Sequence, residues 1–355
     1  MYRLPKMHLS KWHSPAGSYP AACDKRKVTT GTVPAVITLK KGMNKLKVAI
    51  IGAGAMGSLY GYYLANAGYS VELVDIWQQH VDEINRNGLT IIDGNKHHNI
   101  FIPAIADPRL LKEMKDLIIV FVKSYQTAEA IESCLHLVNE QTRILTLQNG
   151  VGNVEILQQY IPSEQIMGGT TSHGANVKQP GQIIHAGKGK TVMGRIDGQN
   201  RTRERWLAEK FAKAGIEVEI NDNIQTLLWD KLMVNVGINA LTALLNIENG
   251  KLLEMEETQM LMKYLVAEAG NVSSQAKIQL TCQNPLEHVK SIAEATGDNK
   301  SSMLQDLIKG RRTEVDYING AIIKKGKEVG VSTPYNKVMV ALIKAKEKQV
   351  KREPF

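Results

Sequence analysis

The chain has 355 residues, with 43% hydrophobic and 22% charged side chains and a formal net charge of +9. This length and composition suit a globular protein with two domains, and no run of 18 apolar residues indicates a transmembrane helix. Residues 1–45 hold nine basic side chains against the single acid Asp24, so the rest of the chain is nearly neutral. We therefore expect neither a nucleic acid nor a membrane as partner.

The three cysteines, Cys23, Cys134 and Cys282, lie far apart and form no CxxC motif. This spacing argues against a disulfide framework and against a zinc site. We therefore expect no bound metal and a cytoplasmic location, where thiols remain reduced.

Residues 1–45 lack hydrophobic periodicity and contain four prolines, which predicts a disordered leader. Met43 opens a segment in which the first strand begins almost at once, and Lys40-Lys41-Gly42 is what a purine-rich ribosome-binding site would encode. We expect residues 1–42 to be an artefact of the chosen start codon, and the intact mass of the natively expressed protein tests this.

The next segment predicts a βαβ unit that binds a dinucleotide. An apolar strand over 47–51 leads into a G-x-G-x-x-G turn, a helix over 58–67 and a second strand over 69–74. In this turn the glycines allow a tight bend, close approach of a pyrophosphate and close packing of helix on strand. The free N–H groups at the helix start also favour phosphates. The candidate cofactor residues of the turn are Gly52, Ala53, Gly54, Ala55, Met56 and Gly57.

Asp75 follows the second strand, 23 residues after Gly52, near the spacing of the acid that binds the ribose hydroxyls. Its carboxylate would repel the 2′-phosphate of NADP, and Ile76 and Trp77 supply no cation, so this corner favours NAD(H). The alternative is that Asp75 only caps the helix expected over 78–85.

Two further apolar runs, 116–122 and 143–147, predict buried parallel strands. Lys123 and Asn149 lie just past their ends, where side chains face the ligand crevice, so both are candidate cofactor contacts. A surface lysine and an ordinary Asn-Gly turn are the alternatives.

Farther along, segments 182–185 and 190–196 flank Ala186-Gly187-Lys188-Gly189 and predict a β-hairpin. His173 and His185 are interpreted as structural histidines rather than catalysts.

From residue 224 onward the pattern is helical, with segments over 226–246, 251–278, 285–295, 301–309, 313–329 and 335–350. The predicted fold class is therefore α/β, with a Rossmann-type doubly wound sheet over 46–221 followed by an all-helical domain over 222–355. We expect the substrate cleft at the junction of the two domains. The long helices also suit a homodimer.

The segment 226–246 carries Lys231, Asn235 and Asn239 at a spacing of four on an otherwise apolar helix, so they share one face. One interpretation is a solvent-facing edge. The other is that this row lines a cleft and binds a small polar ligand, because burying a cation and two amides without partners is costly. Its place directly after the junction favours the cleft. Glu314 is expected to begin a later helix, and the alternative to a functional role is that its carboxylate only complements the dipole of that helix.

Seven motifs in order resemble the ketopantoate reductase (2-dehydropantoate 2-reductase) family across about residues 46–345. They are GAGAMG at 52–57, VKSYQ at 122–126, QNGVG at 148–152, GTTSHGA at 169–175, WDKLMVNVGINALTAL at 229–244, SSMLQD at 301–306 and RTEVDYING at 312–320. The resemblance implies an oxidoreductase that reduces a 2-oxo acid, usually with NADPH, in pantothenate and coenzyme A biosynthesis.

The same resemblance implies a role for each matching residue. Lys231 matches the general acid, and Glu314 the carboxylate near the nicotinamide and that lysine. The substrate contacts that it implies are Asn235, Asn239, Asn249 and Ser302. The cofactor contacts that it implies are residues 52–57, Lys123, Asn149, Ala175 and Glu314.

Asp75-Ile76-Trp77 departs from the family, because many members place a basic residue there for the 2′-phosphate. Two alternatives therefore stay open. The nearer is an NAD-dependent reductase of another bulky 2-oxo acid with the same architecture. The more distant is a non-catalytic protein that senses a dinucleotide.

Overall fold

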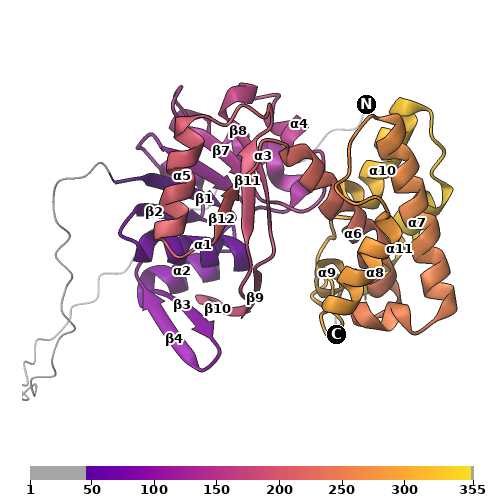
Figure 1. The fold of residues 1–355 in the computed structure, drawn as a ribbon. Helices are drawn as coiled ribbons and strands as arrows, with labels where there is room; N and C mark the ends of the chain where they lie inside the picture. The colour runs from indigo at the N-terminus through magenta and orange to yellow at the C-terminus, as the bar shows by residue number, and fades with distance from the viewer. Residues whose placement is uncertain (1–44, 353–355) are drawn as a thin grey trace, which may run out of the picture. The chain divides into compact units, whose positions relative to one another are not determined.

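The computed structural model describes residues 45–352, and the predicted leader therefore lies almost wholly outside the described residues. Strands occupy the earlier part of the described chain, coloured indigo to pink in Figure 1, whereas the part from α6 onward is helical. The predicted α/β class, a sheet-containing part followed by a helical part, is confirmed. Both parts belong to one compact unit.

The larger sheet has eight strands in the order β12-β11-β8-β7-β6-β1-β2-β5. The chain enters at β1, adds β2 and β5 on one side and β6, β7 and β8 on the other, so the sheet is doubly wound. All neighbours are parallel except β8 and β11. The strands are β1 Lys47–Ile51, β2 Ser70–Val74, β5 Ala104–Ile105, β6 Leu117–Val120, β7 Arg143–Thr146, β8 Ile166–Thr171, β11 Thr191–Arg195 and β12 Val218–Ile220.

A second sheet of four strands, in the order β4-β3-β10-β9, packs against helix α1. The pair β3–β4 is a hairpin, and β10 runs parallel to β3 and antiparallel to β9. The strands are β3 Leu89–Asp93, β4 Lys96–Ile100, β9 Gly174–Gln179 and β10 Gln182–Gly187.

The predicted hairpin around Ala186-Gly187-Lys188-Gly189 is wrong. Its two strands belong to different sheets, because β10 pairs with β9 and β3 whereas β11 pairs with β8 and β12. The reversal lies instead at Pro180-Gly181, where Gln182 pairs with Gln179 and Gly181 has φ +71°. Residues 166–179 and 182–195 thus form one long two-stranded ribbon that passes from the large sheet into the small one.

Helices cover the sheets of the N-terminal part. The helix expected over 58–67 begins three residues earlier, at Ala55, within the G-x-G-x-x-G motif. Its inward face buries Leu59, Tyr60 and Leu64, which anchors the helix start against the strands. The helices are α1 Ala55–Asn66, α2 Gln78–Asn87, α3 Thr127–Glu132, α4 Asn153–Leu157 and α5 Thr202–Lys213.

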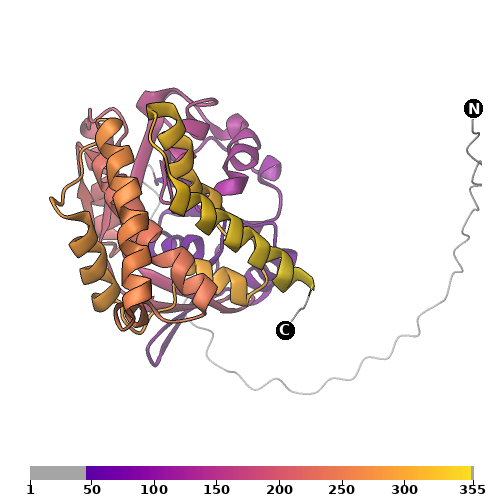
Figure 2. The ribbon, with the colours of Figure 1, turned by 90° about the vertical axis from the view of Figure 1, so that its right-hand side faces the viewer.

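The helical part is built around α6, which contacts α7, α8, α9 and α11. Helices α7 and α11 also pack together, as Figure 2 shows, and Tyr264 stacks on Tyr335 with ring centroids 4.6 Å apart. Gly237 allows a close approach, since an added Cβ would lie 2.7 Å from Val289 Cγ1. The helices are α6 Ile224–Leu245, α7 Glu256–Gln275, α8 Pro285–Ala295, α9 Ser302–Ile308, α10 Asn319–Val329 and α11 Pro334–Arg352.

The expected helix over 313–329 is two elements. Glu314 precedes a short 3-10 turn over Val315–Tyr317, and α10 begins only at Asn319. Glu314 therefore does not begin α10, and the alternative that it only complements the dipole of this helix is wrong. The Glu314 carboxylate instead contacts Ser124 in the turn after β6, as described below.

Candidate functional site

The glycine turn between β1 and α1 has the form that a dinucleotide requires. Gly52 has φ +99°, and an added Cβ would lie 2.5 Å from Val122 N. A Cβ on Gly57 would lie 1.9 Å from Gly52 O, so helix and strand pack closely only with glycine there. At Gly54, in contrast, nothing lies within 4 Å of an added Cβ. That open space is where a pyrophosphate can approach the backbone.

Asp75 follows β2, at the position of the ribose-binding acid. Its Oδ1 accepts a hydrogen bond from Trp77 N at 2.9 Å, so it also shapes the chain leading into α2. The side-chain N-cap that the alternative required is absent from α2 within the described residues. Asp75 Oδ2 makes no hydrogen bond to the described residues, and Ile76 beside it is 77% exposed. The carboxylate therefore retains an acceptor for a ribose hydroxyl.

Lys123 joins the end of β6 to the helical part. Its Nζ lies 2.6 Å from Asp306 Oδ2 and 3.6 Å from Glu314 Oε2. Burial lowers the pKa of Lys123, but the two carboxylates outweigh it and hold that pKa above its ordinary value. Burial raises the pKa of the Asp306 carboxyl above its ordinary value, although the nearby Lys123 ammonium acts to lower it. Lys123 is thus a partly buried ion-pair partner rather than a free surface lysine.

Glu314 is buried, and its Oε1 accepts hydrogen bonds from Ser124 N at 2.9 Å and from the Ser124 hydroxyl at 2.8 Å. The same hydroxyl lies 2.9 Å from Asn149 O. The chain after Asn149 also touches the helical part, because Val151 N donates to Tyr317 O at 3.1 Å. Lys123, Asn149 and Glu314 are therefore brought together by the ends of β6 and β7.

The polar row of α6 is not a solvent-facing edge. Lys231 and Asn235 are half-buried and Asn239 is only 5% exposed. Lys231 Nζ donates to Thr171 O, at the end of β8, at 3.4 Å. Burial lowers the pKa of Lys231 to about 8, while the nearby Glu314 carboxylate acts to raise it. The row thus meets the sheet-containing part and lies within electrostatic reach of Glu314.

The two asparagines of the row have spare hydrogen-bonding capacity. The buried Nδ2 of Asn235 has no partner among the described residues. The side chain of Asn239 likewise forms no hydrogen bond to them. Because a buried donor without a partner costs on the order of 1–3 kcal/mol, the Asn235 amide suits a ligand that brings an acceptor oxygen.

Ser302 lies at the start of α9, beside the row. The preceding Ser301 has its Oγ 2.8 Å from Thr242 Oγ1, one turn beyond Asn239 on α6. Asn249 is placed differently, because its Nδ2 donates to Thr296 Oγ1 at 3.0 Å while its buried Oδ1 has no partner among the described residues.

Ala175 lies in β9, paired with His185 in the small sheet. No hydrogen bond within residues 45–352 joins Asn249 or Ala175 to Lys231 or Glu314. The structure thus assembles Lys231, Glu314, Lys123 and Asn149 more directly than it does these two residues.

Three residues of this arrangement were not singled out from the sequence: Ser124, Asp306 and Thr171. Ser124 and Asp306 stand inside the motifs VKSYQ and SSMLQD, which was a usable signal. Their partners lie 190 and 183 residues away, so the sequence pattern did not disclose the contacts. Thr171 contributes only its backbone carbonyl, so the chemistry of its side chain could not have predicted this contact.

His173 and His185 contact each other, with Nδ1 and Nε2 3.2 Å apart, and lie against Tyr63. Burial lowers the pKa of both rings. Their interactions with each other and with Tyr63 fit the structural role expected for them. Across the described residues, no three His, Cys, Asp or Glu side chains gather as a metal site, and no helix could cross a membrane.

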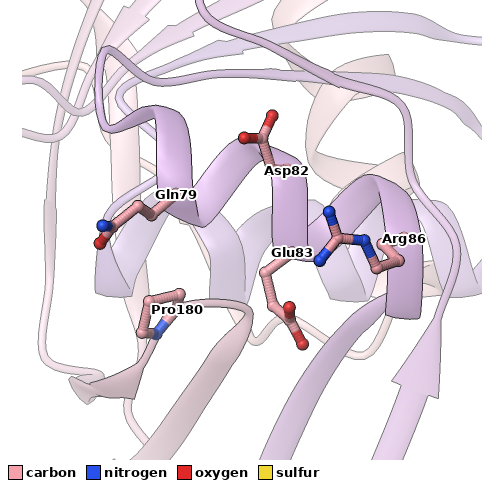
Figure 3. Close-up of a pocket in the computed structure, with 5 residues that line it drawn as sticks. All are labelled: Gln79, Asp82, Glu83, Arg86 and Pro180. Carbon is pink, nitrogen blue, oxygen red and sulfur yellow. The ribbon is translucent and has the colours of Figure 1, made fainter.

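A surface pocket lies between α2 and the β9–β10 turn, and Figure 3 shows the side chains that line it: Gln79, Asp82, Glu83, Arg86 and Pro180. None of the residues predicted to bind cofactor or substrate belongs to this lining. The pocket is therefore separate from the arrangement around Lys231.

Comparison with known proteins gives matches along most of the chain. Residues 48–198 match the family Ketopantoate reductase PanE/ApbA, and residues 223–347 match Ketopantoate reductase PanE/ApbA C terminal. The chain is 38% identical to the 2-dehydropantoate 2-reductase of Pyrococcus abyssi, over 85% of this chain and 98% of the relative. It is 33% identical to that of Halobacterium salinarum, over 84% and 98%.

A solved structure similar to this one is D-mandelate dehydrogenase with NADH and anilino(oxo)acetate. It has a TM-score of 0.81 and 33% identity, covering 86% of this chain and 99% of that one. The two matched segments include the glycine turn and the Lys231 row, the features from which the site was built. The chain therefore belongs to the ketopantoate reductase family.

Proposed function

We propose that the protein is a 2-dehydropantoate 2-reductase that reduces ketopantoate to pantoate with NAD(P)H, as part of pantothenate and coenzyme A biosynthesis. The observation that carries the proposal is the position of Lys231. Its ammonium group donates to Thr171 O at 3.4 Å, where α6 meets the end of β8, and it stands in one row with an asparagine whose amide has no partner among the described residues. A cation beside unpaired amides suits a 2-oxo acid, which brings one keto oxygen and one carboxylate.

Lys231 is the proposed general acid. The bound nicotinamide supplies the hydride that reduces the keto carbon. As negative charge develops on the keto oxygen, the Lys231 ammonium stabilises it and then donates its proton. With a pKa of about 8, Lys231 is mostly protonated at pH 7, yet it gives up its proton more readily than an ordinary lysine does.

Glu314 is the proposed catalytic carboxylate, because its charge keeps the pKa of Lys231 from falling further. Ser124 supports this role by holding the carboxylate through two hydrogen bonds. Lys123 partly neutralises the same carboxylate, and its salt bridge with Asp306 fixes its own position.

Asn235, Asn239 and Ser302 are proposed to bind the substrate carboxylate and hydroxyl. Amides and hydroxyls donate hydrogen bonds without changing the net charge of the site. A rigid helix holds both asparagines at a fixed separation, which contributes through orientation of the bound substrate. We include Asn249 with these, on the ground of its buried Oδ1, which lacks a partner within the described residues.

The proposed cofactor contacts are residues 52–57, Asp75, Lys123, Asn149, Ala175 and Glu314. We propose a dinucleotide-binding domain over 46–221 and a helical domain over 222–355 that binds substrate and forms a homodimer. The last strand ends at Ile220 and α6 begins at Ile224, which supports this boundary. We also propose a cytoplasmic location, which suits the free thiols of Cys134 and Cys282.

A second candidate is an NAD-dependent reductase of a bulkier 2-oxo acid. Two observations favour it: the carboxylate of Asp75 stands at the ribose position without a cation in Ile76 or Trp77, and D-mandelate dehydrogenase with NADH is among the similar structures. This candidate uses the same proposed roles for Lys231 and Glu314.

Initial-rate measurements with the purified full chain test both candidates. Ketopantoate is compared with branched and aromatic 2-oxo acids, including phenylglyoxylate, each with NADPH and with NADH. The first candidate predicts the highest kcat/KM for ketopantoate, and the second predicts it for a bulkier acid with NADH. Dinucleotide binding without turnover of any of these acids would contradict both and favour a sensor.

A further inference from the structure

His80 lies in the first turn of α2 and is fully buried between the glycine turn and the small sheet. Its Nδ1 accepts a hydrogen bond from Gly181 N at 3.0 Å, and its Nε2 lies 3.0 Å from Ala53 O. A backbone N–H can only donate and a carbonyl can only accept. The ring is therefore neutral, with its proton on Nε2, and it bridges the glycine turn to the β9–β10 turn.

Ala53 O receives a second donor from the same side. The Ser58 hydroxyl donates to it at 2.6 Å, from within α1. Ser58 and His80 are each 0% exposed, so water does not compete for this carbonyl. Two buried donors on one oxygen fix the orientation of the peptide between Ala53 and Gly54.

That orientation determines where the next N–H points. No described peptide bond is cis, and in a planar trans peptide the N–H points opposite to the C=O. Gly54 N therefore points away from His80 and Ser58, and it donates to no acceptor among the described residues. Gly54 is also the glycine next to which an added Cβ would meet only open space.

We propose that His80 is a positioning residue for the cofactor, which holds the Ala53–Gly54 peptide so that Gly54 N–H faces the dinucleotide pyrophosphate. A turn held in its binding conformation before the ligand arrives loses less conformational entropy on binding. The inference rests on the proposed dinucleotide binding and adds to it a residue outside the G-x-G-x-x-G motif.

The neighbours of His80 hold its ring in place. Trp77 stacks on it, with ring centroids 5.1 Å apart and planes 8° apart. The Pro180 turn runs beside α2, as Figure 3 shows, and a Cβ on Gly181 would lie 2.6 Å from Glu83 Cγ. Trp77 also donates its backbone N–H to Asp75, so this contact chain connects the proposed ribose corner to the pyrophosphate turn.

A purely structural role would only tie α2 to the β9–β10 turn, and two substitutions separate that role from the proposed one. In His80→Gln, the amide N–H₂ reaches the place of Nε2 and keeps a donor for Ala53 O. In His80→Asn, the shorter side chain reaches only the place of Nδ1 and keeps an acceptor for Gly181 N.

The test measures dissociation constants for NADPH and NADH by fluorescence titration of the full chain, together with KM for the 2-oxo acid, kcat at saturating cofactor, and Tm. We expect His80→Asn to raise the cofactor Kd about 10-fold, which corresponds to about 1.4 kcal/mol and is within the range for one lost hydrogen bond. We expect His80→Gln to raise it at most about twofold. We expect KM for the 2-oxo acid and kcat to stay within about twofold in both variants, because Lys231 is not disturbed.

Equal Kd values for the two variants, or an unchanged Kd in His80→Asn, would overturn the proposal. If His80→Asn does not fold, His80→Gln carries the test, because it keeps a donor for Ala53 O, and a rise of about tenfold in its cofactor Kd with Tm unchanged overturns the proposal as well. Failure of the unaltered chain to bind any dinucleotide would instead contradict the proposed function, and this inference with it.

Discussion

Glu314 accepts two hydrogen bonds from Ser124, one from the backbone N–H at 2.9 Å and one from the hydroxyl at 2.8 Å, across 190 positions of sequence. Ser124 directly follows Lys123, which lies 3.6 Å from the other oxygen of the same carboxylate. The turn that follows strand β6 thus sets the orientation of the carboxylate that acts on the pKa of Lys231.

Removing the Glu314 charge is expected to shift the pH profile of reduction. Lys231 acts as an acid, so the rate is full below its pKa of about 8 and falls about tenfold per pH unit above it. Because Glu314 raises that pKa, Glu314→Gln moves the falling limb to lower pH. The measurement is kcat/KM against pH. Glu328→Gln, at an exposed glutamate of α10, is the control and should leave the limb in place. If kcat/KM of Glu314→Gln fell at the same pH as that of the unaltered chain, Glu314 would have no influence on the pKa of Lys231.

Replacing the proposed general acid is expected to abolish most turnover. Lys231→Ala should lower kcat at least about 100-fold, the range expected for loss of a general acid, with the circular dichroism spectrum unchanged. Lys263→Ala, on the exposed side of α7, is the matched control and should retain full activity. Near-normal turnover in Lys231→Ala would exclude the assignment.

The ribose corner is expected to select the cofactor. The double variant Asp75→Ser, Ile76→Arg removes a repelling carboxylate and adds a cation for the 2′-phosphate, while serine can still accept from Trp77 N. The ratio of kcat/KM for NADPH to that for NADH should rise at least about tenfold. Asp82→Ser, an exposed acid on α2, should leave the ratio unchanged. An unaltered ratio in the double variant would mean that Asp75 has only its structural bond to Trp77.

The second glycine of the turn is expected to matter for binding but not for folding. An alanine Cβ at Gly54 enters open space, so Gly54→Ala should shift Tm by no more than about 2 °C, as for an ordinary surface change. The same Cβ occupies the approach to the pyrophosphate, so the cofactor Kd should rise about tenfold or more. Calorimetric Tm and fluorescence titration measure the two effects. Gly57→Ala is the contrasting variant, expected to lower Tm because its Cβ would lie 1.9 Å from Gly52 O.

The sequence predicted those parts of the fold whose signal is local. Strand β1 has the bounds that were expected, and the polar spacing on α6 identified the row whose Lys231 contacts Thr171 O at the end of β8. The predicted hairpin around 186–189 was wrong because the alternation of apolar and polar residues predicts a strand but does not identify the strand with which it pairs. The Pro180-Gly181 turn signal lay in the sequence and points to the true reversal.

The motifs of the site could be recognised in the sequence, but the contacts between them could not. Ser124, Asp306 and Glu314 were visible as polar residues, but their pairing joins segments more than 180 positions apart. Nothing in the sequence indicated a role for His80 in the site, since a histidine in the first turn of an amphipathic helix is common. Only the fold shows that its ring is buried against Ala53 O.

The long ribbon formed by β8–β9 and β10–β11 has a practical consequence for labelling this enzyme. A surface β-turn is ordinarily a good place to insert an epitope tag or a fluorophore. The turn at Pro180-Gly181 is a poor choice, because Gly181 N donates a hydrogen bond to His80 Nδ1. Farther along the same ribbon, Thr171 O also accepts a hydrogen bond from Lys231. The turn at Gly94 between β3 and β4, where an added Cβ meets nothing within 4 Å, is the better attachment point.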